Sequence, residues 1–145
     1  MKKTVFAALL GLASSIAFAQ MSPVGLWRTI DDETKTEKSL VRITESGGVL
    51  TGKVEKIADP AKANANCDKC TDERKDKPVL GMTILRGVKP SSEAGTWEGG
   101  DILDPNNGKI YKVRMKPIDG GKQMEVRGFI GVALLGRTQT WARVE

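Results

Sequence analysis

The sequence predicts a single all-β domain, an eight-stranded antiparallel barrel of the up-and-down kind, behind a cleavable export signal. Two observations predict the barrel. Short runs of β-branched and alternating apolar and polar residues recur along the chain, and Gly, Asn, Asp and Pro separate them. The expected strands are residues 24–30, 39–44, 49–57, 79–88, 96–103, 109–117, 123–129 and 137–144.

The separators carry the residues that tight hairpins need. Residues 46–48, 105–108 and 119–121 are rich in Gly and Asn, which supply the positive φ of such turns. Strands joined mainly by hairpins form a meander, and a meander removes its edges by closing into a barrel. Eight strands enclose an interior that side chains fill or that holds one small ligand. The sixth expected strand alternates most clearly, with one face made of Tyr111, Val113 and Met115.

The first residues read as a secretory signal peptide rather than as part of the barrel. Lys2 and Lys3 precede an apolar stretch that ends at the small-residue cleavage site around Ala19. A membrane-spanning helix needs about 20 apolar residues, which is more than this stretch provides. We therefore expect residues 1–19 to be removed, residues 20–145 to form the barrel domain, and the protein to be periplasmic or secreted.

Length and charge fit one globular domain without affinity for nucleic acid. The chain has 145 residues, of which 28% are charged and 39% hydrophobic. Its formal net charge is +5, and two of those charges belong to Lys2 and Lys3, so the expected mature domain carries +3. So mild a charge on an exported protein argues against a nucleic-acid partner.

One long segment, residues 58–78, interrupts the regular spacing of the strands. Asp59 and Pro60 predict a short helix there, with Asp59 as N-cap and Pro60 in the first position. The segment also holds Cys67 and Cys70, the two cysteines of the chain. A thiol redox centre and half of a zinc site are open alternatives, but paired cysteines in an exported protein favour a disulfide.

Little in the sequence supports catalysis. The chain has no His, which removes the commonest general base and the usual partner of a Ser or Cys nucleophile. Its carboxylates are scattered, and their spacing sets no two of them against one another. We expect a protein that is not an enzyme and that has no metal site and no cofactor.

The segment from Ile130 to Leu135 is apolar although it falls between two expected strands. One interpretation is a short buried plug that closes an end of the barrel. The other is an apolar lip at the barrel mouth that contacts a ligand, a membrane or a partner. Long apolar runs are usually buried, which slightly favours the plug.

Several blocks of the sequence occur in the order typical of one family. They are the Cys67–Cys70 motif and residues 76–82, 102–105, 126–131 and 134–141. Ahead of them, Gly25-Leu26-Trp27 resembles the start of a lipocalin-like fold. From Pro23 to the C-terminus the chain resembles the bacterial exported family called domain of unknown function 2147. The resemblance implies a lipocalin-like barrel, in the broad group that includes fatty-acid-binding proteins. It implies no activity, cofactor or ligand.

The resemblance also implies a structural role for two residues. In lipocalins the Trp of the first strand packs at the closed end of the barrel under an Arg from the last strand. Trp27 matches the first position. Arg143 is the expected partner, and strand alternation puts it on one face with Arg137, Gln139 and Trp141.

Two functions from different classes are compatible with these features, and a thiol oxidoreductase is a third only because of the cysteine pair. The first is a carrier of a small amphipathic or apolar ligand, such as a fatty-acid-like anion, in which Arg127 or Arg137 meets the anionic group. The second is an interaction module that contacts an envelope protein or a membrane through residues 130–135 or through the Cys67–Cys70 loop. The expected ligand-binding residues are Met82, Ile84, Tyr111, Val113, Met115, Arg127, Arg137, Gln139 and Trp141.

Overall fold

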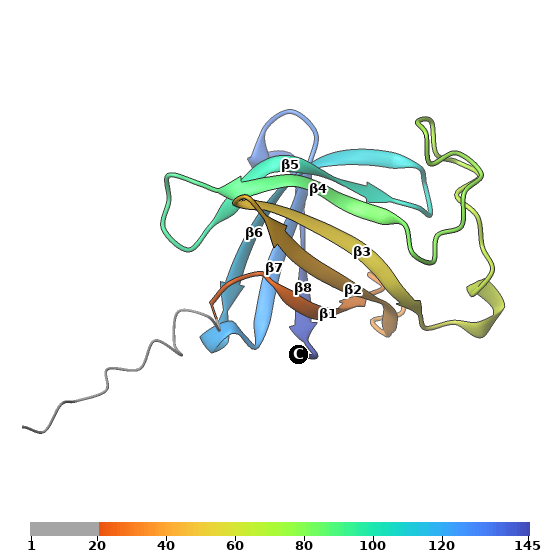
Figure 1. Ribbon diagram of the computed structural model, residues 1–145, viewed down its shortest axis with the longest axis horizontal. Coiled ribbons are helices and arrows are strands. Elements are labelled where there is room, and N and C mark those ends of the chain that lie inside the picture. The colour runs from red at the N-terminus through yellow and green to blue at the C-terminus, as the bar shows by residue number, and fades with distance from the viewer. Residues whose placement is uncertain (1–20) are drawn as a thin grey trace, which may run out of the picture.

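The computed structural model describes residues 21–145, which form a closed antiparallel barrel whose eight strands follow one another in chain order (Figure 1). The predicted fold class is therefore confirmed, whereas the predicted signal peptide lies outside the described residues. The strands are β1 (Gly25–Ile30), β2 (Glu37–Ser46), β3 (Val49–Ile57), β4 (Thr83–Pro90), β5 (Trp97–Asp104), β6 (Lys109–Ile118), β7 (Gln123–Phe129) and β8 (Arg137–Arg143).

Two strands, β2 and β4, differ from the prediction by more than one residue at an end. β2 extends beyond the expected residues 39–44 at both ends. β4 begins at Thr83 rather than at Val79, because the chain turns immediately before it. Gly81 adopts a left-handed φ of 83° at this turn, and its N–H donates to the carbonyl of Val54 in β3.

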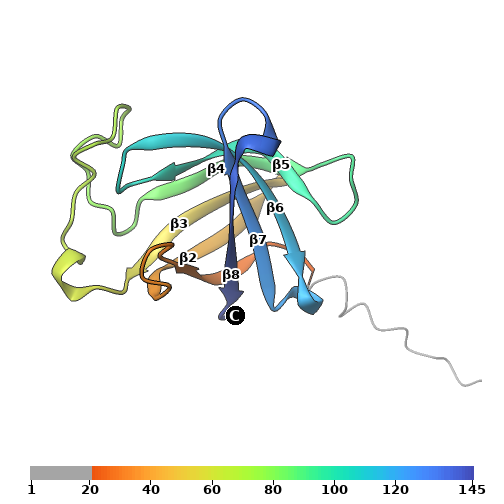
Figure 2. The same ribbon diagram turned by 180° about the vertical axis from the view of Figure 1, so that it is seen from behind.

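The strand order collects the loops into two groups, one at each end of the barrel (Figures 1 and 2). The β1–β2, β3–β4, β5–β6 and β7–β8 connections lie at one end, called here the open end. The other three connections lie at the opposite, closed end, together with Ser22 and Glu145 from the ends of the described chain. None of the helices within residues 21–145 combines the length and hydropathy that a membrane crossing requires.

Trp27 and Arg143 plug the closed end. Trp27 is fully buried, and its indole Nε1 donates to the carbonyl of Pro23 at 2.7 Å. The guanidinium of Arg143 stacks over the indole ring, which is the pairing that the resemblance implied. The same guanidinium donates to main-chain carbonyls of Ser22, Val24 and Gly121. Three separate segments are thereby tied together beneath the barrel.

Buried apolar side chains fill the interior next to this plug. They form one packed cluster with Trp27. The largest are Val41, Ile43, Leu50, Leu85, Val88, Val113, Met115 and Met124. The closed half of the barrel is therefore a packed core rather than a ligand space.

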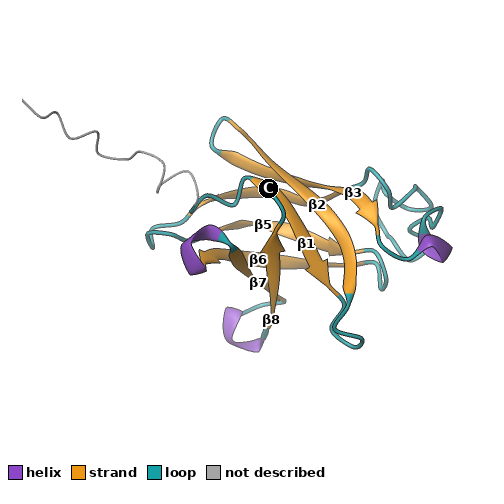
Figure 3. Ribbon diagram, turned by 90° about the horizontal axis from the view of Figure 1, so that it is seen from below, coloured by secondary structure: helices purple, strands orange, loops and turns teal. Residues whose placement is uncertain are grey.

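Three short 3₁₀ helices lie in the connections, η1 (Pro60–Lys62), η2 (Asp119–Gly121) and η3 (Ala133–Leu135) (Figure 3). η1 is the short helix predicted after Asp59, whose carboxylate accepts the N–H of Ala61 at 2.9 Å as an N-cap does. η1 belongs to the long β3–β4 connection.

The β3–β4 connection contains the disulfide between Cys67 and Cys70, with the two Cα atoms 5.4 Å apart, as predicted. It packs tightly against the β5–β6 hairpin. A side chain at Gly108 would put its Cβ 1.9 Å from the carbonyl oxygen of Lys69. Only glycine permits this approach, so the disulfide loop and the hairpin form one rim at the open end.

Candidate functional site

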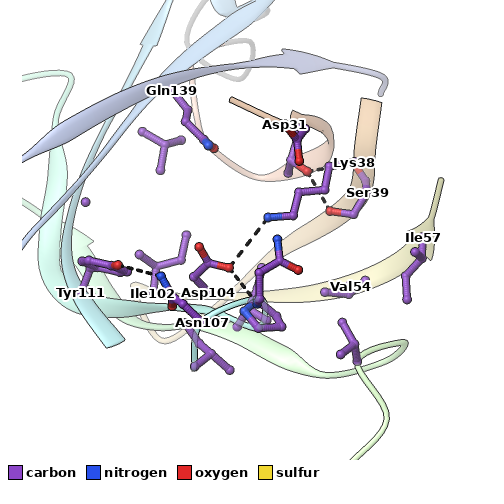
Figure 4. Close-up of a pocket in the computed structure, with 18 of the residues that line it drawn as sticks. Asp31, Lys38, Ser39, Val54, Ile57, Ile102, Asp104, Asn107, Tyr111 and Gln139 are labelled. Carbon is purple, nitrogen blue, oxygen red and sulfur yellow. Dashed lines mark hydrogen bonds and ion pairs between the residues drawn. The ribbon is translucent and has the colours of Figure 1, made fainter. Parts of the chain in front are cut away.

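A cavity of about 890 Å³ occupies the open half of the barrel. Its inner wall is apolar and comes from strands all around the barrel, and Figure 4 shows part of that wall. The wall residues include Val54, Ile57, Ile84, Ile102, Leu103, Val126 and Trp141. The barrel therefore has a filled half and a hollow half, and the hollow half has the volume of a small-molecule site.

Polar side chains gather where the cavity meets the open end. Lys38 of β2 reaches across the cavity toward Asp104 at the end of β5, with its ammonium nitrogen 3.8 Å from the carboxylate (Figure 4). Asn107 of the next hairpin donates its side-chain amide to the hydroxyl of Tyr111 at 3.0 Å. An apolar wall below and hydrogen-bonding groups above make the cavity amphipathic.

The cavity also borders a seam between the first and last strands. β1 and β8 pair only through Trp27 with Arg143 and Arg28 with Ala142, close to the closed end. Toward the mouth, side chains replace backbone pairing.

Asp32 is the centre of that side-chain link. Its carboxylate accepts a hydrogen bond from Gln139 Nε2 at 2.9 Å and forms an ion pair with Arg137 Nη2, also at 2.9 Å. Trp141 Nε1 donates to Gln139 Oε1 at 3.2 Å. A continuous set of polar contacts thus connects Trp141 in the cavity wall with the β1–β2 loop at the mouth.

Asp31, beside it, is a structural residue of the same loop. Backbone N–H groups of Thr34 and Glu33 donate to its carboxylate at 2.9 Å and lower the pKa of Asp31. The carboxylate stays ionised at neutral pH and fixes the shape of the loop.

Charge at the mouth is mixed. Within residues 21–145 the cavity lining includes five carboxylates and four cationic side chains. The mouth as a whole therefore does not select for anions or cations, and selectivity has to come from single groups that reach the interior. Lys38 and Asp104 are the pair that does so.

Comparison with known proteins places the chain in a family. Residues 25–143 match the family described as "Uncharacterized protein conserved in bacteria (DUF2147)". The chain belongs to this family. A solved structure, protein HP1028 from Helicobacter pylori, which is described as belonging to the lipocalin family, is similar with a TM-score of 0.73. The likeness covers 86% of this chain and 84% of that one at 20% sequence identity, so it supports the fold alone. No curated protein matches the chain.

The structure of this DUF2147 member brings five of the predicted ligand-binding residues to the cavity and leaves four outside it. Ile84, Tyr111, Arg137, Gln139 and Trp141 border the cavity. Of the other four, three are buried apolar side chains and the fourth is Arg127.

Val113, Met115 and Met82 are packed in the core instead of lining the cavity. Val113 and Met115 face inward like Tyr111, but they lie nearer to the closed end, where the interior is filled. Met82 is buried in the turn ahead of β4. Strand alternation predicted the inward direction of the β6 side chains correctly but carried no information about depth along the barrel.

The two predicted anion-binding arginines already have other partners. Arg127 does not border the cavity, because its guanidinium donates to the carbonyls of Ala133 and Leu134 and to the hydroxyl of Thr138. Arg137 does border it, but its side chain is 72% exposed and pairs with Asp32. Neither guanidinium extends across the cavity as the Lys38 ammonium does.

The segment of residues 130–135, called here the apolar loop, is not a buried plug. Ile130, Val132, Leu134 and Leu135 are 64%, 59%, 89% and 80% exposed. The loop lies beside the cavity mouth, and Ile130 and Leu135 also border the cavity. The plug interpretation is wrong because Trp27 and Arg143 close the barrel at its other end.

Sequence reasoning missed the residues that give the mouth its polarity, Lys38, Asp104 and Asn107. Lys38 lies beside the β1–β2 connection, and Asp104 and Asn107 lie at the β5–β6 connection. In an up-and-down barrel these two connections lie at the same end. The strand order alone could therefore have brought these three residues together. Composition could not, because they look like ordinary surface residues.

The cysteine pair does not provide a reactive thiol. Both cysteines are in the disulfide and are almost completely buried, so neither sulfur is open to attack by an external thiolate. Within residues 21–145 no three His, Cys, Asp or Glu side chains are close enough together to hold a metal ion.

Proposed function

We propose that the barrel binds one small amphipathic molecule in its open half, with an apolar tail on the inner wall and a polar head at the mouth. The cavity itself carries this proposal. A volume of about 890 Å³ lies within the range of roughly 300–1,000 Å³ that is usual for small-molecule sites. In the proposed complex, the cavity-lining residues Ile84, Ile102 and Trp141 surround the tail, and Tyr111 and Asn107 lie near the head.

A fatty-acid-like anion is the ligand class that we infer, with Lys38 as its partner in place of Arg127 and Arg137. The 3.8 Å separation of Lys38 from Asp104 exceeds hydrogen-bond length, so all three ammonium protons can be redirected to an incoming carboxylate. Asp104 keeps a hydrogen bond from the backbone N–H of Asn106 when Lys38 turns away. The Asp104 carboxylate therefore keeps a hydrogen-bond donor after the exchange.

The proposed role is binding and not catalysis, in the periplasm or outside the cell. The disulfide supports an oxidising compartment, since such bonds persist in exported proteins. The apolar stretch before Ala19 is a second, independent argument for export.

Calorimetric titration with a fatty acid and with the alcohol of the same chain length tests the proposal. The parent protein should bind the acid more tightly than the alcohol. K38Q should lose about tenfold in affinity for the acid and keep its affinity for the alcohol, because one charge-assisted hydrogen bond is removed. Lys56 is an exposed lysine of β3 that does not border the cavity, so K56Q should behave as the parent. Absence of binding by both ligands would overturn the proposed function, and equal loss for both ligands in K38Q would overturn the role of Lys38.

The exposed apolar loop supports a second candidate function, contact with an envelope protein or with a membrane. Four large apolar side chains in water are costly unless another surface covers them. This candidate and the first are compatible, because the loop borders the mouth of the cavity.

A further inference from the structure

We propose that the apolar loop inserts into the surface of a lipid bilayer, so that the mouth of the barrel faces the membrane. The proposal develops the second candidate function, surface contact, and stands whether or not the cavity binds a ligand. Three features of the loop carry it: its exposed side chains, its hydrogen-bonded carbonyls and the cations at its base.

The exposed side chains form a narrow apolar protrusion. The loop stands clear of the strands between β7 and β8, at the top of Figures 1 and 2. No charged residue occurs between Arg127 and Arg137 in the sequence. Leu134, at the tip, is the most exposed large apolar side chain of residues 21–145.

Three consecutive carbonyls of the loop, those of Val132, Ala133 and Leu134, already accept hydrogen bonds. Arg127 donates to the carbonyl of Ala133 at 2.6 Å and to that of Leu134 at 3.3 Å. Within the loop, the N–H of Leu135 donates to Val132 and the N–H of Gly136 to Ala133, both at 3.1 Å. Carbonyls that already accept hydrogen bonds cost less to move out of water, because an unpaired polar group is expensive to bury in hydrocarbon.

The mouth as a whole has mixed charge, but the side chains directly at the base of the loop are mainly cationic and suit an anionic lipid surface. Arg127 and Arg137 bracket the loop, and Lys112 of β6 pairs with Phe129 where the loop begins. Apolar side chains with basic residues behind them are the pattern of an interfacial anchor.

Docking of this kind would place the cavity at the bilayer surface. Ile130 and Leu135 have one side toward solvent and one toward the cavity. If the tip enters the lipid, the opening beside these two residues lies at the level of the headgroups. A molecule could then pass between bilayer and barrel without crossing water.

Vesicle co-sedimentation of the exported form of the protein tests the proposal, with vesicles of phosphatidylcholine alone and of phosphatidylcholine with phosphatidylglycerol. The parent should sediment with the anionic vesicles and less with the neutral ones. The affinity of V132S/L134S for the anionic vesicles should fall by about tenfold or more, because two inserted apolar side chains are lost. Val132 and Leu134 do not border the cavity, so the double variant should bind a fatty acid as the parent does.

The matched control is L80S/V144S, which replaces one exposed leucine and one exposed valine away from the loop. It should sediment as the parent does. Failure of the parent to bind either kind of vesicle would overturn the proposal, as would equal binding by V132S/L134S. If the parent instead self-associates in ultracentrifugation and V132S/L134S does not, a second copy covers the loop and the lipid assignment is wrong.

Discussion

The guanidinium carbon of Arg143 lies 4.3 Å from the centroid of the Trp27 indole ring, and the two side chains together close one end of the barrel. A guanidinium over an indole face gains both electrostatic attraction and apolar contact. Because this end is sealed, any ligand has to enter through the other. The arrangement at the closed end thus determines where the functional end of the molecule lies.

Replacing Trp27 with alanine should lower the free energy of unfolding by about 3–5 kcal/mol, because a fully buried aromatic side chain is removed from the core. Urea unfolding followed by circular dichroism measures the change. W27F keeps an aromatic ring and should lose distinctly less. An unchanged unfolding midpoint in the alanine variant would show that Trp27 does not stabilise the fold.

Arg143 should not be replaceable by lysine. The guanidinium donates from Nε and both Nη atoms to separate carbonyls, and an ammonium group cannot reproduce that planar fork. R143K is expected to lose about 1–3 kcal/mol of stability through acceptors left without a donor. The same unfolding experiment checks it, and parent-like stability in R143K would show that charge alone suffices there.

Loss of the disulfide should cost about 2 kcal/mol, as expected for a bond that closes a very short loop. C67S/C70S is compared with the parent in thermal unfolding. Reductant should lower the melting temperature of the parent and leave that of the variant unchanged. A variant as stable as the oxidised parent would show that packing against the β5–β6 hairpin already holds the loop.

Asp72 should contribute to the stability of the fold at neutral pH, and this contribution should be lost in acid. Hydrogen bonds from Arg74 lower the pKa of its carboxyl to about 2. A depressed folded-state pKa stabilises the fold above the unfolded value of about 4, and this contribution disappears as the pH falls from about 4 to about 2.

Unfolding of the parent and of D72N across that range measures this effect. D72N should be less stable at neutral pH, because buried Arg74 loses its ionic partner, and should show a smaller decrease in stability in acid. A pH profile parallel to that of the parent would assign the acid sensitivity to other carboxylates.

The architecture was predictable from local signals, since alternation and turn residues each act over a few positions. Even Arg143 over Trp27 could be expected, because the resemblance placed one on the first strand and one on the last. Local signals could not predict how far along the barrel axis an inward-facing side chain lies. Met115 and Tyr111 face the same interior, but only Tyr111 reaches the hollow half.

The sequence also could not predict the role of a side chain that is set by its contacts in the folded protein. Arg127 looked available for an anion, but it is used by carbonyls of the apolar loop, which lie several residues away and form a contact only after folding. Lys38 looked like a surface lysine, and only barrel closure brings it opposite Asp104. Both differences arise from tertiary contacts rather than from wrong assignment of the strands.

Gly128 offers a direct way to fill the cavity. It lies in β7 on the cavity wall, and a Cβ added there would lie 3.5 Å from Tyr111 Cβ, an ordinary contact distance. G128A should therefore be tolerated and keep most of the cavity, whereas G128L should occupy the space next to Tyr111 without disturbing the closed end.

Native mass spectrometry of the parent, G128A and G128L after incubation with a long-chain fatty acid tests the central claim most directly. The parent and G128A should each carry one bound fatty acid per chain, and G128L should carry none while it remains folded. A parent that carries no fatty acid, or a folded G128L that carries as much as the parent, would contradict a binding site for a fatty-acid-like anion in the open half of the barrel.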